Sequence, residues 1–126
     1  MDFDIETHFV RKCVKKEYQE RVLFELKSKK HREKAISRFA HSAETVLNSS
    51  FLKYSFSNFT NKFIQNADVK NCYVISNGLY DGHNLPIQEA VEFCQESYMT
   101  VILISSEFIA IKEEFEKSVP FVFVFS

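Results

Sequence analysis

The chain has 126 residues and a formal net charge of −1, and 45 % of its residues are hydrophobic, as in ordinary soluble globular domains. No apolar run reaches the roughly 18 residues that a membrane-spanning helix needs, and no charged-then-apolar leader opens the sequence. We therefore expect a single-domain cytoplasmic protein without a membrane partner. Phe occurs 14 times and Trp is absent, which predicts a core of large rings without polar groups.

The small net charge hides two regions of opposite sign. Residues 11–38 contain eleven Lys and Arg and four Glu, a balance of +7, whereas residues 68–126 contain three Lys and nine Asp and Glu, a balance of −6. Such polarity predicts that charge selects a partner or its orientation, unless the two regions mainly attract each other.

The N-terminal part of the domain, residues 1–66, is predicted to be helical. Ile5, Phe9 and Cys13 recur every four residues, which indicates a long amphipathic helix over 4–26. A second helix is expected over 29–48. A further short helix is expected over 57–65, and residues 51–56 are left open as an additional strand.

The C-terminal part, residues 67–126, alternates apolar runs with helical patterns. The order is typical of a βαβαβ unit with a mostly parallel sheet. The predicted strands are 71–76, 100–105 and 121–125, and the predicted helices are 86–98 and 106–118. The last strand is apolar at every position, so we expect helices on both faces of the sheet. The predicted fold is a three-layer α/β/α arrangement in which two or three N-terminal helices cover this small sheet.

One polar stripe on the second predicted helix is a candidate binding surface. Its members, at helical spacing, are His31, Lys34, Arg38 and His41. The stripe fits a solvated face, an electrostatic contact with phosphates or an acidic protein, or a catalytic group for RNA cleavage. Positions 31 and 41 would lie about 15 Å apart along a helix, too far to flank one phosphate, which disfavours catalysis.

The loop Asn77–Leu85 is a second candidate, because it holds both glycines of the chain and follows a strand end. Its binding candidates are Tyr80, Asp81, His83 and Asn84. The alternative is a compact turn whose polar groups satisfy their own backbone. An acidic group near the C-terminus is either a solvated helix face or a surface that meets a basic partner. Its members are Glu113, Glu114 and Glu116.

We assign no catalytic residue, metal site or cofactor. Cys13, Cys72 and Cys94 fall on apolar faces without CxxC spacing, and the four histidines lack HExxH or HxH spacing. The glycines do not form a phosphate-binding loop, because GxxxxGK[ST] and GxGxxG are both missing.

Over its whole length, the composition resembles the immunity proteins of bacterial polymorphic toxin systems, such as contact-dependent growth inhibition. Like them, this chain is small, rich in Phe and Lys, and without catalytic motifs. The resemblance implies a non-enzymatic protein that binds a cognate toxin domain and blocks it.

Residues 68–126 resemble the last domain of eukaryotic-type peptide-release factors and ribosomal L7Ae-like modules in the order and spacing of DVKNCYVIS, TVILISSEF and FVFVFS. This implies an alternative function as an RNA- or ribosome-associated module that uses the basic residues 11–38. A small hydrolase or nuclease centred on the Asn77–Leu85 loop is a second alternative.

Overall fold

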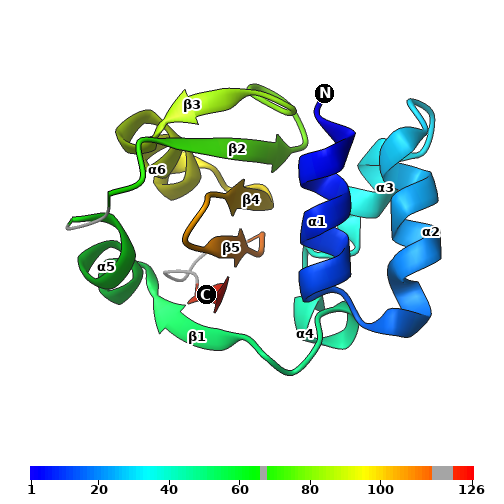
Figure 1. The fold of residues 1–126 in the computed structure, drawn as a ribbon, viewed down its shortest axis with the longest axis horizontal. Coiled ribbons are helices and arrows are strands. Elements are labelled where there is room, and N and C mark those ends of the chain that lie inside the picture. Colours follow the sequence, from blue (N-terminus) through cyan, green and yellow to red (C-terminus); the bar gives the residue numbers. More distant parts are fainter. Residues whose placement is uncertain (66–67, 115–120) are drawn as a thin grey trace.

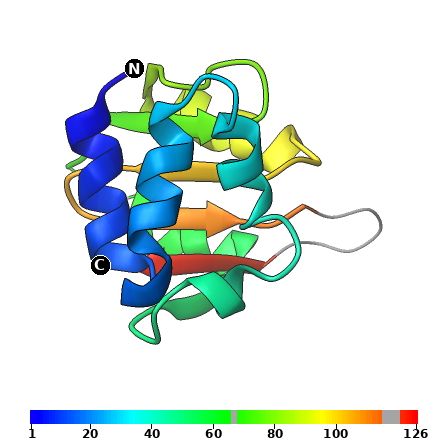
Figure 2. The same ribbon diagram turned by 90° about the vertical axis from the view of Figure 1, so that its right-hand side faces the viewer.

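The computed structural model describes residues 1–65, 68–114 and 121–126. These residues form a six-stranded sheet in the order β1-β6-β5-β4-β2-β3, with every neighbouring pair antiparallel. Helices lie on both faces of the sheet (Figure 1), and α1, α2 and α3 stand in front of it in Figure 2. The helices are α1 (Phe3–Cys13), α2 (Lys16–Lys27), α3 (Arg32–Ser37), α4 (Ala43–Val46), α5 (Phe56–Phe59), the π-helix η1 (Thr60–Ile64) and α6 (Ile87–Glu96). The strands are β1 (Leu52–Ser55), β2 (Asn71–Ser76), β3 (Asn84–Pro86), β4 (Val101–Ile104), β5 (Ile109–Lys112) and β6 (Phe121–Phe125).

The predicted three-layer fold with a small, mostly parallel sheet is wrong. The structure has six antiparallel strands, and the connection after β4 is a tight turn instead of a helical crossover. The backbone N–H of Ser105 donates to the carbonyl of Phe108 at 2.9 Å, and the Ser105 hydroxyl also donates to it. A turn this short can join only antiparallel neighbours.

The predicted helix over 106–118 is replaced at its centre by β5. Ile109 and Ile111 face one side of the sheet and Ala110 the other, and β5 pairs with both β4 and β6. The sequence is ambiguous here, because Phe108 and Ile111 fit helical spacing whereas Ile109 and Ile111 fit strand alternation. Complete burial of β5 between two strands favours the extended form.

The loop after β2 also contains a strand that the sequence did not predict. β3 pairs with β2 as a hairpin, and α6 then crosses β2 to reach β4 on its other side. At the opposite edge β1, from the stretch left open by the sequence, pairs with β6.

The sheet separates two apolar cores. Tyr73, Ile75 and Ile102 point towards α1–α4, together with Phe123 and other large side chains. The alternate strand residues, such as Val74 and Leu103, point towards α5, η1 and α6. This period of two on fully buried strands is why both faces must be covered.

Two predicted long helices are each divided into two shorter helices, at positions where their backbone forms hydrogen bonds with a distant segment. The helix over 4–26 divides into α1 and α2, because the carbonyl of Cys13 accepts from Asn48 and the N–H of Lys15 donates to Val46, both at 2.8 Å. The helix over 29–48 divides into α3 and α4, and between them the carbonyl of Ala40 accepts from the N–H of Glu114 at 2.9 Å. Neither break contains Gly or Pro, so local sequence carries no signal for it.

Candidate functional site

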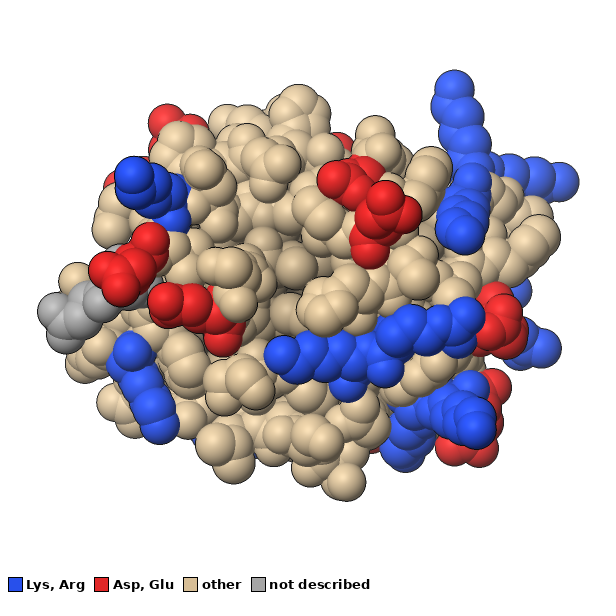
Figure 3. All heavy atoms as spheres, viewed as in Figure 1, with Lys and Arg blue, Asp and Glu red and all other residues tan. Residues whose placement is uncertain are grey.

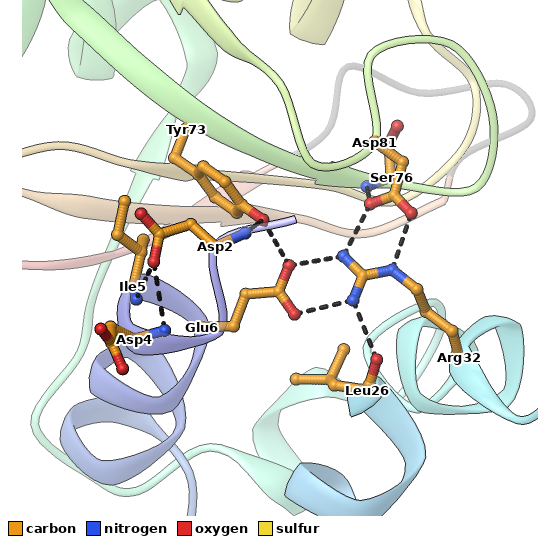
Figure 4. Close-up of polar contacts among 9 residues, drawn as sticks. All are labelled: Asp2, Asp4, Ile5, Glu6, Leu26, Arg32, Tyr73, Ser76 and Asp81. Carbon is orange, nitrogen blue, oxygen red and sulfur yellow. Dashed lines mark hydrogen bonds and ion pairs between the residues drawn. The ribbon is translucent and has the colours of Figure 1, made fainter. Parts of the chain in front are cut away.

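A buried polar seam joins α1, α3 and the loop after β2 (Figure 4). The Arg32 guanidinium donates to both carboxylate oxygens of Glu6, at 2.7 and 2.6 Å, and to both of Asp81, at 2.7 and 3.0 Å. Another N–H donates to the carbonyl of Leu26 at 3.0 Å. All five N–H donors of the guanidinium therefore have acceptors, and Arg32 has none left for a ligand.

Tyr73 of β2 extends the polar seam. Its hydroxyl donates to Oε2 of Glu6 at 2.6 Å and accepts from the backbone N–H of Asp2 at 3.0 Å. Burial and the bond to Glu6 raise the pKa of Tyr73. Burial opposes the charge of Arg32, but the hydrogen bonds to Glu6 and Asp81 outweigh it and raise the pKa of that guanidinium. Both groups therefore stay protonated at neutral pH.

The start of α1 places Glu6 in this seam. The Asp2 carboxylate caps the helix by accepting from the N–H groups of Asp4 and Ile5 at 3.1 and 3.2 Å. Glu6 then lies one helical turn before Phe9, on the face of α1 that packs inward. Its side chain is only 2 % exposed, so a charged carboxylate stands at a core position.

The polar seam also fixes the loop between β2 and β3. Oδ1 of Asp81 accepts from the N–H of Ser76 at 3.1 Å, and the Ser76 hydroxyl donates to the carbonyl of Leu79 at 2.9 Å. Tyr80 has a φ of 69° and Gly82 a φ of 79°. The positive φ of Gly82 favours glycine, and a Cβ there would lie 2.8 Å from Cγ of Met1, whose side chain would have to move. Both Asp81 oxygens are occupied, which argues against a role for Asp81 as a general base.

The predicted polar stripe does not form one helix face. α3 ends at Ser37 and α4 begins at Ala43, so positions 31 and 41 lie outside both helices. Nδ1 of His31 makes a hydrogen bond with the Ser28 hydroxyl at 2.9 Å, and Nε2 of His41 lies 3.2 Å from Oε2 of Glu114. Lys34 is exposed on α3.

Arg38 of the same predicted stripe belongs to a second ion pair. It donates to the two carboxylate oxygens of Glu25 at 2.7 and 2.9 Å. These hydrogen bonds hold the pKa of Glu25 below its usual range, against the opposing effect of burial, and they raise the pKa of Arg38. This arginine therefore links α2 to the end of α3, with 20 % of its side chain exposed.

The polar residues of the predicted binding loop are placed at three different positions. Asp81 lies in the polar seam, and the Tyr80 ring lies against His83 and Phe93, at centroid distances of 6.2 and 5.1 Å. Asn84 belongs to β3 and borders a hollow of about 630 Å³ next to α1. The loop is therefore a scaffold with an aromatic tip, and its polar side chains do not gather into one pocket.

Glu113 and Glu114 directly follow β5 and do not belong to a helix, so the predicted helix face is wrong at these two positions. Oε2 of Glu113 accepts from the backbone N–H of Ala43 at 3.0 Å, at the start of α4. Glu114 contacts His41. Glu116 lies outside the described residues.

Burial raises the pKa of the three thiols, Cys13, Cys72 and Cys94, to about 12, so they remain protonated. Within the described ranges, no three His, Cys, Asp or Glu side chains come together as metal ligands. No helix among those residues is long and apolar enough to cross a membrane.

Exposed charge is unevenly distributed over the helices. Eight Lys and Arg of residues 11–38 are exposed, and Figure 3 shows basic side chains gathered where α1 and α2 lie. They are Arg11, Lys12, Lys16, Arg21, Lys27, Lys29, Lys30 and Lys34. On the other side of the sheet, α6 exposes three carboxylates and contains no Lys or Arg. They belong to Glu89, Glu92 and Glu96.

Searches of protein-family models, curated proteins and solved structures found no match to this chain. Three members of the polar seam were not predicted from the sequence, namely Glu6, Arg32 and Tyr73. For two of them a signal exists, because Glu6 and Arg32 each lie three and four residues before buried apolar positions of the same helix.

Proposed function

We propose that this chain is a non-enzymatic binding protein that neutralises a basic partner, most concretely a bacterial toxin domain in the cytoplasm. The supporting observation is a long stretch without cations. Between Asn71 and Ile111 the sequence contains no Lys or Arg, and its exposed acidic residues are Glu89, Glu92, Glu96 and Glu107.

The physical basis is charge complementarity. Domains that act on nucleic acids concentrate Lys and Arg on the surface that meets the phosphates. An acidic surface on the inhibitor attracts that same basic surface, speeds association and excludes the nucleic acid. The α6 side can act in this way because none of its exposed carboxylates has a neighbouring Lys or Arg on the helix.

The test is co-expression with the toxin domain encoded next to the gene for this chain. We expect the two proteins to purify as a complex and the toxin activity to be lost. A variant carrying Glu89→Lys, Glu92→Lys and Glu96→Lys should associate at least tenfold more slowly at low salt. Glu17→Lys with Glu20→Lys, two exposed positions on α2, is the control and should slow association much less, because these charges lie away from α6. Failure of the unmodified chain to bind any such product would contradict the proposal.

A nucleic acid is the second candidate partner, because residues 11–38 expose eight Lys and Arg and only three Glu, which gives this region an excess of positive charge. In that case affinity for RNA should fall steeply as salt is raised, and Lys34→Glu should reduce both affinity and the salt slope. Arg38 is unsuitable for this test because its loss would also leave Glu25 without its partner. RNA binding that is absent or insensitive to salt would exclude this alternative.

A further inference from the structure

The tip of the β2–β3 loop exposes large apolar side chains beside α6. Leu79 is 75 % exposed, Tyr80 41 % and Met99 42 %, and Phe93 of α6 lies partly buried among them. We call Leu79, Tyr80, Phe93 and Met99 the docking patch. Single exposed apolar residues are ordinary, whereas a contiguous group with a polar border is typical of a protein-binding surface.

Two hollows give the docking patch its shape. One of about 380 Å³ is bordered by Leu79, Tyr80, Phe93 and α6, and one of about 170 Å³ by Leu79, Phe93 and Met99. Leu79 and Phe93 line both hollows, so the patch presents a knob between two depressions. Such relief suits side chains that a partner inserts on either side of Leu79.

The border of the docking patch is acidic. Glu89, Glu92 and Glu96 line the larger hollow, at intervals of three and four residues along α6. Among the residues that the structure describes, no Lys or Arg lines either hollow. An occupant must therefore combine apolar side chains for the two hollows with cations for the border.

The loop that carries Leu79 is already held in place. The backbone carbonyl of Leu79 accepts a hydrogen bond from the Ser76 hydroxyl. Two residues later, the Asp81 carboxylate accepts hydrogen bonds from Arg32 and from the backbone N–H of Ser76. Tyr80 is the one non-glycine with positive φ among the described residues, and that conformation persists only when its surroundings enforce it. A pre-ordered loop loses little conformational entropy on binding, which favours affinity.

We infer that the docking patch receives a segment of the partner in which Lys or Arg surrounds aliphatic or aromatic side chains. This inference rests on the proposed function, because it names the surface through which the toxin domain would be bound. It assigns the main binding contribution to the apolar centre at Leu79 and an orienting role to the carboxylates of α6.

The first arm of the test uses synthetic peptides and the intact chain, observed by amide NMR. A short amphipathic peptide of Lys and Leu should shift the signals of Leu79, Phe93 and Met99. A matched peptide with Ser in place of Leu should bind at least tenfold more weakly. Leu79→Ser should weaken binding of the first peptide about tenfold, whereas Leu52→Ser is the control, since Leu52 is 60 % exposed at the opposite edge of the sheet. Shifts confined to α2, or equal binding by Leu79→Ser, would overturn the inference.

The second arm uses the toxin domain encoded beside the gene. Leu79→Ser and Glu92→Lys should each weaken the complex at least tenfold, and Glu107→Lys, an exposed acidic residue outside both hollows, should change it less than twofold. If the toxin domain binds all these variants as tightly as the unmodified chain, the docking patch is wrong while the proposed function stands. If the unmodified chain binds no toxin domain, the proposed function fails, and the peptide arm still decides whether the patch accepts basic apolar segments.

Discussion

Helices pack on both faces of the sheet through apolar cores, but the two cores differ in the polar groups that they contain. On the side of α1–α4, charged groups are built into the core, and Glu6, Glu25 and Arg32 are all at least 93 % buried. On the side of α5 and α6, a cluster of rings fills the space between the helices and the sheet. Its members are Phe56, Phe59, Phe63 and Phe108. Among the described residues on that side, Lys112 is the buried side chain that can carry a charge, and its Nζ donates to the carbonyl of Ser97.

The difference shows how the chain separates stability from positioning. Apolar burial is non-directional, so the ring cluster stabilises the fold without demanding one orientation of each ring. The polar seam is directional, because the five N–H groups of Arg32 fit only one placement of α1, α3 and the loop at Asp81. We therefore expect replacement in the ring cluster to lower stability alone, and replacement in the polar seam to lower stability and loosen the loop.

The largest effect is expected for Phe59→Ala. Phe59 is fully buried and its ring centroid lies 5.5 to 5.9 Å from three other Phe rings. Losing the ring should lower the free energy of unfolding by about 4 kcal/mol in urea titrations, within the usual range for buried Phe. Phe24→Ala, at a site 63 % exposed on α2, is the control and should change it by about 0.5 kcal/mol or less. A loss below about 1 kcal/mol for Phe59→Ala would show that the cluster rearranges to fill the gap.

Arg32→Met should lower the free energy of unfolding by about 3 kcal/mol, because the buried Glu6 and the partly buried Asp81 would lose their cation. Hydrogen exchange of the amides between Ser76 and His83 should also become faster. Adding Glu6→Leu to Arg32→Met should restore part of the stability, since the double variant no longer buries an uncompensated carboxylate at position 6. Strictly additive losses would contradict the direct coupling of Glu6 with Arg32.

The sequence predicted well those elements whose pattern is unambiguous. The strands over 71–76 and 121–125 and the helix beginning near Pro86 are present with nearly the predicted bounds, because continuous apolar runs and a strong helical stripe each fit one structure. The stretch around 108–112 fits both patterns, and only its pairing with β4 and β6 decides between them. Antiparallel order was not predictable in the same way, since it depends on a tight turn at Ser105–Phe108 that contains no Gly or Pro.

The candidate site was harder to predict because its members are distant in the chain. Arg32 meets Glu6 across 26 residues and Asp81 across 49, and such contacts leave no local spacing to recognise. The sequence did single out the loop with Tyr80 and Asp81, through its two glycines and turn dipeptides. The exposed Leu79 at the tip was overlooked, because an apolar side chain in a loop acquires meaning only when Phe93 and Met99 are seen beside it.

Glu25→Gln tests the ion pair between α2 and the end of α3 and should have a defined pH dependence. The hydrogen bonds of Arg38 lower the pKa of Glu25 in the folded chain, so its stabilising effect is complete above the ordinary value of about 4.5 and is lost as pH falls through the lowered pKa. At pH 7 the variant should be less stable by about 2 kcal/mol. The free energies of unfolding of the variant and the unmodified chain should become equal as the pH is lowered into the acid range. Glu20→Gln is the control, since its ion pair with Arg11 has side chains 82 % and 49 % exposed and contributes little. A gap that persists unchanged in acid would indicate packing instead of charge.

Tyr73→Phe is the smallest change and removes the two hydrogen bonds of the Tyr73 hydroxyl, the one donated to Glu6 and the one accepted from the N–H of Asp2. Glu6 would keep both bonds from Arg32 and lose one donor, so the free energy of unfolding should fall by about 1 kcal/mol at pH 7. Tyr54→Phe, whose hydroxyl accepts from Lys62 in an exposed contact at 3.2 Å, should have almost no effect. Because the folded pKa of Tyr73 is raised, the unfolded chain releases this proton first above about pH 10, and stability should decline there. That alkaline decline should be smaller in Tyr73→Phe than in Tyr54→Phe, and an equal decline in both would contradict a raised pKa for the Tyr73 hydroxyl in the folded chain.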